Sequence, residues 1–93
     1  MTEPAAPPLS GEQLLLIAEE FCAAHPVRVR SFAALVAAAA VPGARLHGIP
    51  VFDSPRAGGA ALAEAVRSLR PLSAENETFA RVCQEVYRRF CAE

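Results

Sequence analysis

Apolar residues recur at helical spacing in four stretches of the chain, and most of these stretches carry recognisable start and stop signals. The first predicts a helix over residues 11–24, with Ser10 as its N-cap and Gln13 as the capping-box partner. The pair His25-Pro26 ends it, because a residue that precedes proline is pushed out of the helical region. The apolar positions of this helix are Leu14, Ile17, Ala18, Phe21 and Cys22.

A second helix is predicted over residues 32–40, capped by Ser31 and ended by Pro42-Gly43. Its larger face carries Phe32, Leu35 and Val36. The preceding Val27-Arg28-Val29-Arg30 alternates between apolar and charged residues, which suits a short extended segment.

Residues 44–58 are predicted as a loop or a short β-hairpin, because they combine prolines and glycines with the β-prone pair Val51-Phe52. We interpret Gly58-Gly59 as a hinge-like start of the third helix, which Pro71 prevents from continuing. One stripe of this helix holds Leu62, Val66 and Leu69.

The fourth helix shows the cleanest periodicity, with Ser73 before it and the acids Glu75 and Glu77 in its first turn, where they complement the helix dipole. Glu85 and Arg89 are spaced to form an i,i+4 ion pair on its polar face. The apolar stripe is typical of a core-facing helix, and it leaves room for a partner to cover part of it. Its members are Phe79, Val82, Cys83, Val86, Tyr87 and Phe90.

These elements predict an all-α domain, a bundle of about four helices over residues 10–93, preceded by a flexible, proline-containing lead-in over residues 1–9 that the core does not need. The length of 93 residues suits one domain, and 53% hydrophobic residues exclude general disorder. Twenty of the residues are alanine, which favours helices but adds little core volume.

The formal net charge of -1 excludes strong electrostatic binding to nucleic acid as the default. Residues 27–70 nevertheless carry six arginines against Asp53 and Glu64, which is either an ordinary solvated surface or a surface for an anion or acidic partner. The three cysteines, Cys22, Cys83 and Cys91, have no metal-binding spacing, and no long apolar run or basic leader is present. We therefore expect a cytoplasmic protein with no metal and no membrane association.

Little of the sequence points directly to catalysis. His25 and His47 have no acid or cysteine at triad or ligand spacing, and the serines Ser10, Ser31 and Ser73 are better explained as helix caps. No Walker loop and no GxGxxG occur, so no nucleotide-binding motif is expected.

The layout from residue 29 to residue 80 resembles the Fic/Doc family, in particular the short Doc-type toxins of bacterial toxin–antitoxin pairs. A Val-Arg segment precedes an alanine- and leucine-rich helix that ends at a proline, and then come a flap with an aromatic-x-Pro element and another alanine-rich helix. The matching residues are Val29-Arg30, Leu35, Pro42, Ala44, Gly48, Val51-Phe52-Asp53-Ser54-Pro55 and Leu62. The resemblance implies a truncated Fic/Doc core with a flap that includes Val51, Phe52, Asp53 and Ser54.

The family's catalytic motif, His-Pro-Phe-x-Asp-Gly-Asn-Lys-Arg-Thr-Ala, falls on residues 70–80 in a degenerate form. Only Asn76 survives among the chemically important positions. Arg70 replaces the catalytic histidine and Ala74 the metal-binding aspartate, while Glu77 and Thr78 replace the phosphate-binding lysine and arginine. Arginine does not serve as a general base, alanine does not bind Mg²⁺, and a glutamate repels phosphate.

Three interpretations follow. The first is a catalytically degenerate domain without a cofactor that binds a protein, either an antitoxin-like chain or a second copy, through the stripe formed by Phe79, Val82, Val86, Tyr87 and Phe90. The second is an active transferase that uses ATP and Mg²⁺ through rearranged residues, with Arg70 or Arg81 on a phosphate and Asn76 orienting it. The third is a small helical nucleic-acid-binding module, which we do not favour, that would use Arg28, Arg30, Arg45 and Arg56.

Overall fold

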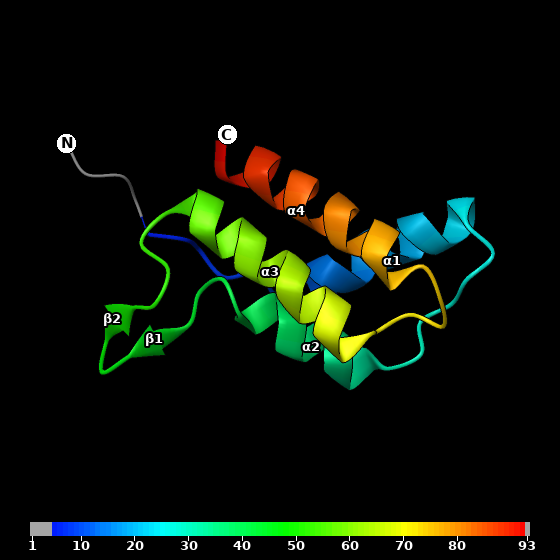
Figure 1. Cartoon of the computed structure of the whole chain (residues 1–93), viewed down its shortest axis with the longest axis horizontal. Coiled ribbons are helices and arrows are strands. Elements are labelled where there is room, and N and C mark those ends of the chain that lie inside the picture. The colour runs from blue at the N-terminus through cyan, green and yellow to red at the C-terminus, as the bar shows by residue number, and fades with distance from the viewer. Residues whose placement is uncertain (1–4, 93) are drawn as a thin grey trace.

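A computed structural model describes residues 5–92 of the chain as four helices and one small hairpin (Figure 1). The elements are α1 (Gly11–Ala24), α2 (Phe32–Ala40), β1 (Arg45–Leu46), β2 (Ile49–Pro50), α3 (Pro55–Leu69) and α4 (Asn76–Ala92). The all-α prediction is confirmed, and the hairpin lies within the segment for which a loop or hairpin was predicted. None of the helices in this part of the chain has the length and apolar character needed to cross a membrane.

The first two helices begin where their capping residues predict. The Ser10 hydroxyl accepts from the Gln13 backbone N–H at 3.0 Å, and the Gln13 side chain accepts from the Ser10 N–H at 2.8 Å, which completes the capping box. Ser31 caps α2 in the same way, accepting from the Ala34 N–H at 3.1 Å. At the end of α1, the His25 ring stacks on Phe21 with 3.9 Å between ring centroids.

The predicted start of the third helix is wrong by a turn. Helix α3 begins at Pro55, with the Ser54 hydroxyl accepting from the Ala57 N–H, so Gly58-Gly59 lies inside the helix and is not a hinge. Both glycines lie at close contacts: a Cβ atom at Gly58 would lie 2.5 Å from the Ala6 Cβ, and one at Gly59 would lie 3.3 Å from the Tyr87 ring. They therefore let other segments approach α3 rather than let the chain bend.

Helix α4 also begins later than Ser73 suggests, at Asn76. The Ser73 hydroxyl accepts from the Arg28 backbone N–H at 3.1 Å and the Ser73 N–H donates to the Arg28 carbonyl at 2.8 Å. Ser73 is thus not a helix cap, because its hydroxyl and its N–H both form hydrogen bonds with Arg28, in the loop between α1 and α2. An isolated antiparallel bridge between Val29 and Leu72 joins the same two loops.

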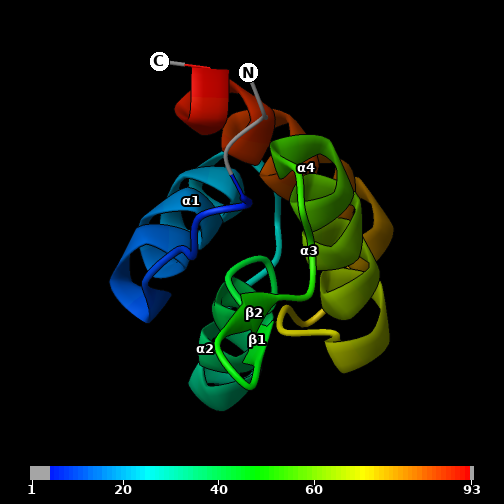
Figure 2. The ribbon, with the colours of Figure 1, turned by 90° about the vertical axis from the view of Figure 1, so that its left-hand side faces the viewer.

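The helices enclose one core, with α3 and α4 as the most extensively packed pair and α1 and α2 packed beneath them (Figures 1 and 2). Phe79 from α4 meets Phe21 from α1 at a centroid distance of 5.2 Å. The largest fully buried side chains include Tyr87, Phe79, Leu14, Leu35, Leu62 and Leu72.

The prediction that the core does not need residues 1–9 is wrong for the described part of that segment. Ala6 and Leu9 are buried, and the Tyr87 hydroxyl donates to the Pro7 carbonyl at 2.6 Å. The segment also pairs with the body through its backbone, since the Leu9 N–H donates to the Ala39 carbonyl. Pro7 and its neighbours thus cover the core between α2, α3 and α4.

Candidate functional site

The five positions matched to the family motif all lie at the corner between α3 and α4, so the structure does bring them together. Arg70 adopts the left-handed conformation (φ 50°, ψ 62°) that ends α3. The Arg30 guanidinium donates to the carbonyls of Leu69 and Arg70, each at 2.9 Å, and satisfies the end of the helix. Arg30 therefore has a structural task at this corner.

Asn76 is the buried polar side chain of the corner, with an exposed fraction of 5%. Its side-chain oxygen accepts from the Leu72 N–H at 2.9 Å, and its amide nitrogen donates to the Leu72 carbonyl at 3.1 Å. The oxygen and the nitrogen of the amide thus both have a hydrogen-bond partner in the backbone of Leu72, and buried polar groups need such partners. Asn76 holds the turn before α4 rather than facing a ligand.

Glu77, an acidic residue of the corner, is paired with neighbouring arginines. Its carboxylate accepts from Arg67 at 2.8 Å and lies 3.5 Å from Arg81. The hydrogen bond from Arg67 holds the pKa of Glu77 below its ordinary value, and it raises the pKa of Arg67 in turn. Arg81 thus binds a carboxylate in this structure, where the transferase interpretation has it bind a phosphate.

Ala74 and Thr78, the remaining motif positions, are exposed on the same corner. Between residues 5 and 92 there is no group of three or more side chains of the types that bind metals. Chemically, the corner is a network of satisfied hydrogen bonds and ion pairs that stabilises the junction of two helices.

The predicted flap divides into two parts with different roles. Val51 is exposed and follows the hairpin, whereas Phe52 is half-buried against the core and its carbonyl accepts from the Ala6 N–H at 3.3 Å. Asp53 is exposed, and Ser54 caps α3. Only the first of these four residues belongs to a projecting surface.

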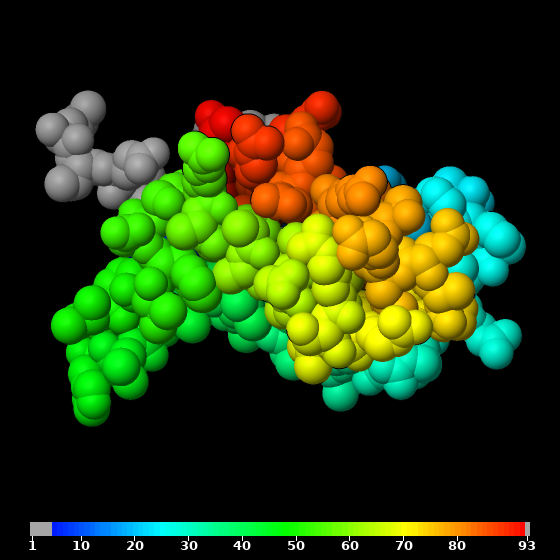
Figure 3. Space-filling view, in the orientation of Figure 1, coloured from blue at the N-terminus to red at the C-terminus, as the bar shows by residue number. Residues whose placement is uncertain are grey.

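The residues that sequence reasoning missed are Leu46 and Ile49, which pair across the hairpin and are 66% and 69% exposed. The turn between them has positive φ at His47 (52°) and Gly48 (80°), as a type I′ turn requires. The available signal was the dipeptide His47-Gly48 between the apolar residues Leu46 and Ile49. Figure 3 shows the hairpin as a protrusion at one end of the molecule.

The predicted partner face on α4 is only partly available. Phe79 and Tyr87 are fully buried, because α1, α3 and the segment at residues 5–9 cover them, so they do not belong to a free face. Val82 packs against the core, and Val86 and Phe90 remain 38% and 40% exposed. Burial, together with the nearby Cys91 thiol, raises the pKa of Tyr87.

The arginines of the nucleic-acid interpretation do not form one surface. Arg30 binds the end of α3, Arg45 donates to the Gly48 carbonyl in the hairpin, and Arg56 lies in the first turn of α3. The two ends of this 15-residue helix are about 20 Å apart. The three cysteines are free, and burial raises the pKa of the Cys83 thiol to about 12.

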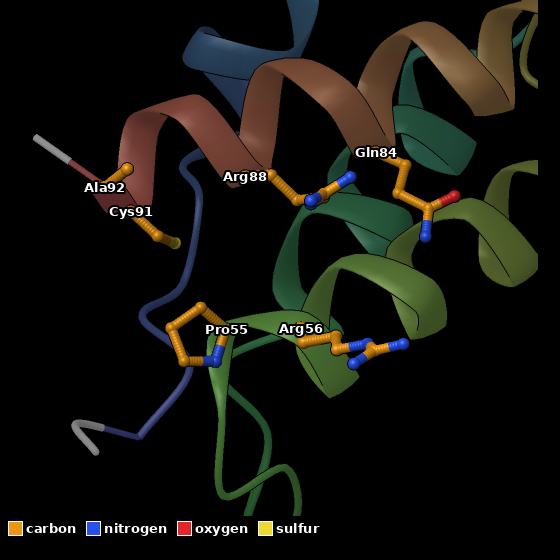
Figure 4. Close-up of a pocket in the computed structure, with 6 residues that line it drawn as sticks. All are labelled: Pro55, Arg56, Gln84, Arg88, Cys91 and Ala92. Atoms are coloured by element: carbon orange, nitrogen blue, oxygen red, sulfur yellow. The ribbon is translucent and has the colours of Figure 1, made fainter.

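A cleft lies between the first turn of α3 and the last turns of α4, at the opposite end of these helices from the corner (Figure 4). Its volume is about 580 Å³. The lining residues are Pro55, Arg56, Gln84, Arg88, Cys91 and Ala92.

Comparison with known proteins identifies no matching family model, no matching curated protein and no matching solved structure.

Proposed function

We propose that this chain is a catalytically degenerate Fic/Doc-like domain that acts by binding a protein partner, either an antitoxin-like chain or a second copy of itself. The observation that carries the proposal is the hairpin, which holds Leu46, Ile49 and Val51 away from the core with more than half of each side chain exposed. Large apolar side chains gathered on one projection are a feature of interaction surfaces.

The hairpin is well suited to a partner that covers it. Its apolar side chains line a shallow hollow of about 340 Å³. Complete burial of one such side chain contributes about 1.5–3 kcal/mol. The Val51 N–H donates to the Ala44 carbonyl at 2.9 Å and extends the pairing of the hairpin by one residue on each side.

The corner between α3 and α4 supports the non-catalytic part of the proposal. A transferase would need a proton acceptor and positive charge facing a nucleotide. Here Asn76 forms hydrogen bonds with the backbone of Leu72, and the acidic Glu77 forms ion pairs with Arg67 and Arg81. The side chains that would have to contact a triphosphate already form hydrogen bonds or ion pairs within the protein.

Partner binding is tested with the full chain and the product of any gene adjacent to its own. Light scattering gives the mass of the chain alone and of the mixture, so a homodimer and a heterocomplex are distinguished. The variant Leu46→Ser/Ile49→Ser should lose the complex. Leu16→Ser, a matched change at a 63% exposed leucine on α1, should keep it. Equal binding by both variants would remove the hairpin from the proposal.

The non-catalytic part is tested by incubating the chain with ATP, Mg²⁺ and a translation factor and measuring the mass of the factor. The expected result is an unmodified factor. The active-transferase interpretation instead predicts the added mass of a phosphoryl or adenylyl group, and a gain of that mass that depends on Asn76 would establish it.

A further inference from the structure

The cleft between α3 and α4 is lined by basic and amide groups from two facing helices. Arg56 comes from the first turn of α3, and Arg88 and Gln84 come from the facing side of α4 (Figure 4). The Arg56 and Arg88 side chains extend in the same direction from the two facing helices, and Gln84 lies next to Arg88 on α4 (Figure 4). The two helices approach closely here, since a Cβ atom at Gly59 would be in van der Waals contact with the Arg88 and Gln84 side chains, at 3.7 and 3.8 Å.

The positive charge of this cleft is only weakly compensated. Within residues 5–92, no carboxylate forms an ion pair with Arg56. Arg88 is 3.7 Å from Glu85, but the same carboxylate is closer to Arg89, at 3.1 Å. Among residues 5–92, no acidic side chain lines the cleft. Two arginines therefore line the cleft, and within the described residues Glu85 is the one carboxylate that pairs with either of them.

Two arginines and an amide define the ligand chemistry. Guanidinium stays protonated and donates in a fork that matches phosphate oxygens, and the Gln84 amide offers two further donors. A phosphate monoester carries close to two negative charges at neutral pH and has three acceptor oxygens, which is enough to accept from more than one arginine. The volume of about 580 Å³ leaves room for the group that carries the phosphate.

We propose that the cleft between Arg56 and Arg88 binds a phosphate monoester dianion. The phosphate has two possible sources, a small phosphorylated molecule or a phosphorylated serine of a protein. This site is separate from the proposed function, because the cleft and the hairpin have no residue in common.

The test is titration of the full-length protein by calorimetry with inorganic phosphate, phenyl phosphate, a phosphoserine peptide and the same peptide with serine. Arg56→Gln and Arg88→Gln should each weaken binding of the phosphorylated probes about tenfold, which corresponds to the loss of one charge-assisted contact of about 1.4 kcal/mol. The matched control is Arg81→Gln, an exposed arginine of α4 outside the cleft, for which the affinity should not change.

The probes also identify the source. Tighter binding of the phosphoserine peptide than of phenyl phosphate assigns the site to a protein ligand, and the reverse order assigns it to a small molecule. No binding of any phosphorylated probe, or equal weakening by Arg81→Gln, would overturn the proposal. Since the hairpin variant Leu46→Ser/Ile49→Ser keeps the cleft, it should bind phosphate normally, so failure of either proposal is detected separately.

Discussion

Asn76 illustrates how one side chain can resemble a catalytic residue while serving the fold. By its spacing Asn76 corresponds to the asparagine of the Fic/Doc motif that the sequence resembles. In the structure its amide forms two hydrogen bonds with the backbone of the buried residue Leu72. Sequence spacing located Asn76 at the correct corner. It gave no information on the direction of the amide, because that depends on how the turn over residues 70–75 folds.

Replacing Asn76 should therefore change stability. Asn76→Ala leaves the Leu72 N–H and carbonyl without partners in a buried place, and the free energy of unfolding should fall by about 1–3 kcal/mol. Urea denaturation measures the difference. Thr78→Ala, at an exposed neighbour, should stay within about 0.5 kcal/mol and serves as the control. Equal effects of the two changes would contradict the structural role.

Glu77 makes stability depend on pH. Its pKa is lower in the folded chain than its ordinary value of about 4.3, so the ion pair with Arg67 stabilises the folded state above that pH. The stabilisation is lost as the pH falls through the folded pKa. The difference in unfolding free energy between the wild type and Glu77→Gln should be largest near neutral pH and shrink below about pH 4. A difference independent of pH would exclude this ion pair as its cause.

At the scale of elements, local signals set the helix starts wherever the capping side chain has no tertiary competitor. Ser10 and Ser31 cap the helices that they precede. Ser54-Pro55 carries an equally good start signal, which the neighbouring glycine pair obscured. Ser73 differs because Arg28, 45 residues away in sequence, takes its hydrogen bonds. A hydrogen bond between residues so far apart in the chain cannot be predicted from the sequence around Ser73.

At Gly58 of α3, close packing should outweigh the ordinary preference for alanine over glycine in a helix. Gly58→Ala would normally stabilise a helix by about 1 kcal/mol. Here the new methyl group meets the Ala6 Cβ at 2.5 Å, so the variant should be less stable than the wild type. Adding Ala6→Gly should restore much of the loss, and a double-mutant cycle in urea measures the coupling. Additive effects would show that the two residues do not touch.

For the whole molecule, the decisive feature is that residues 5–9 complete the core. An alanine-rich chain has few large side chains to bury, so the contributions of Leu9 and of the Tyr87–Pro7 hydrogen bond count for more. The prolines near the N-terminus led to the prediction of a flexible lead-in, whereas Ala6 and Leu9 of this segment are buried. Whether such a segment packs depends on a groove formed by α2, α3 and α4 together.

Truncating Leu9 should test this closure. Leu9→Ala should lower the free energy of unfolding by about 2 kcal/mol, because Leu9 is 7% exposed and its side chain leaves a cavity. The same change at Leu16, which is 63% exposed on α1, should cost much less. Thermal or urea unfolding distinguishes the two. Equal losses would mean that the segment is not part of the cooperative core.

The sequence by itself determined the helical class, the positions of α1 and α2 and the apolar stripe of α4, because caps and periodicity act within a few residues. Tertiary structure alone decided three other matters: that Asn76 turns inward, that the lead-in closes the core, and that Arg56 and Arg88 share a cleft. Each depends on segments that are distant in the chain and meet only when the helices pack. Contacts of that kind leave no local pattern in the sequence.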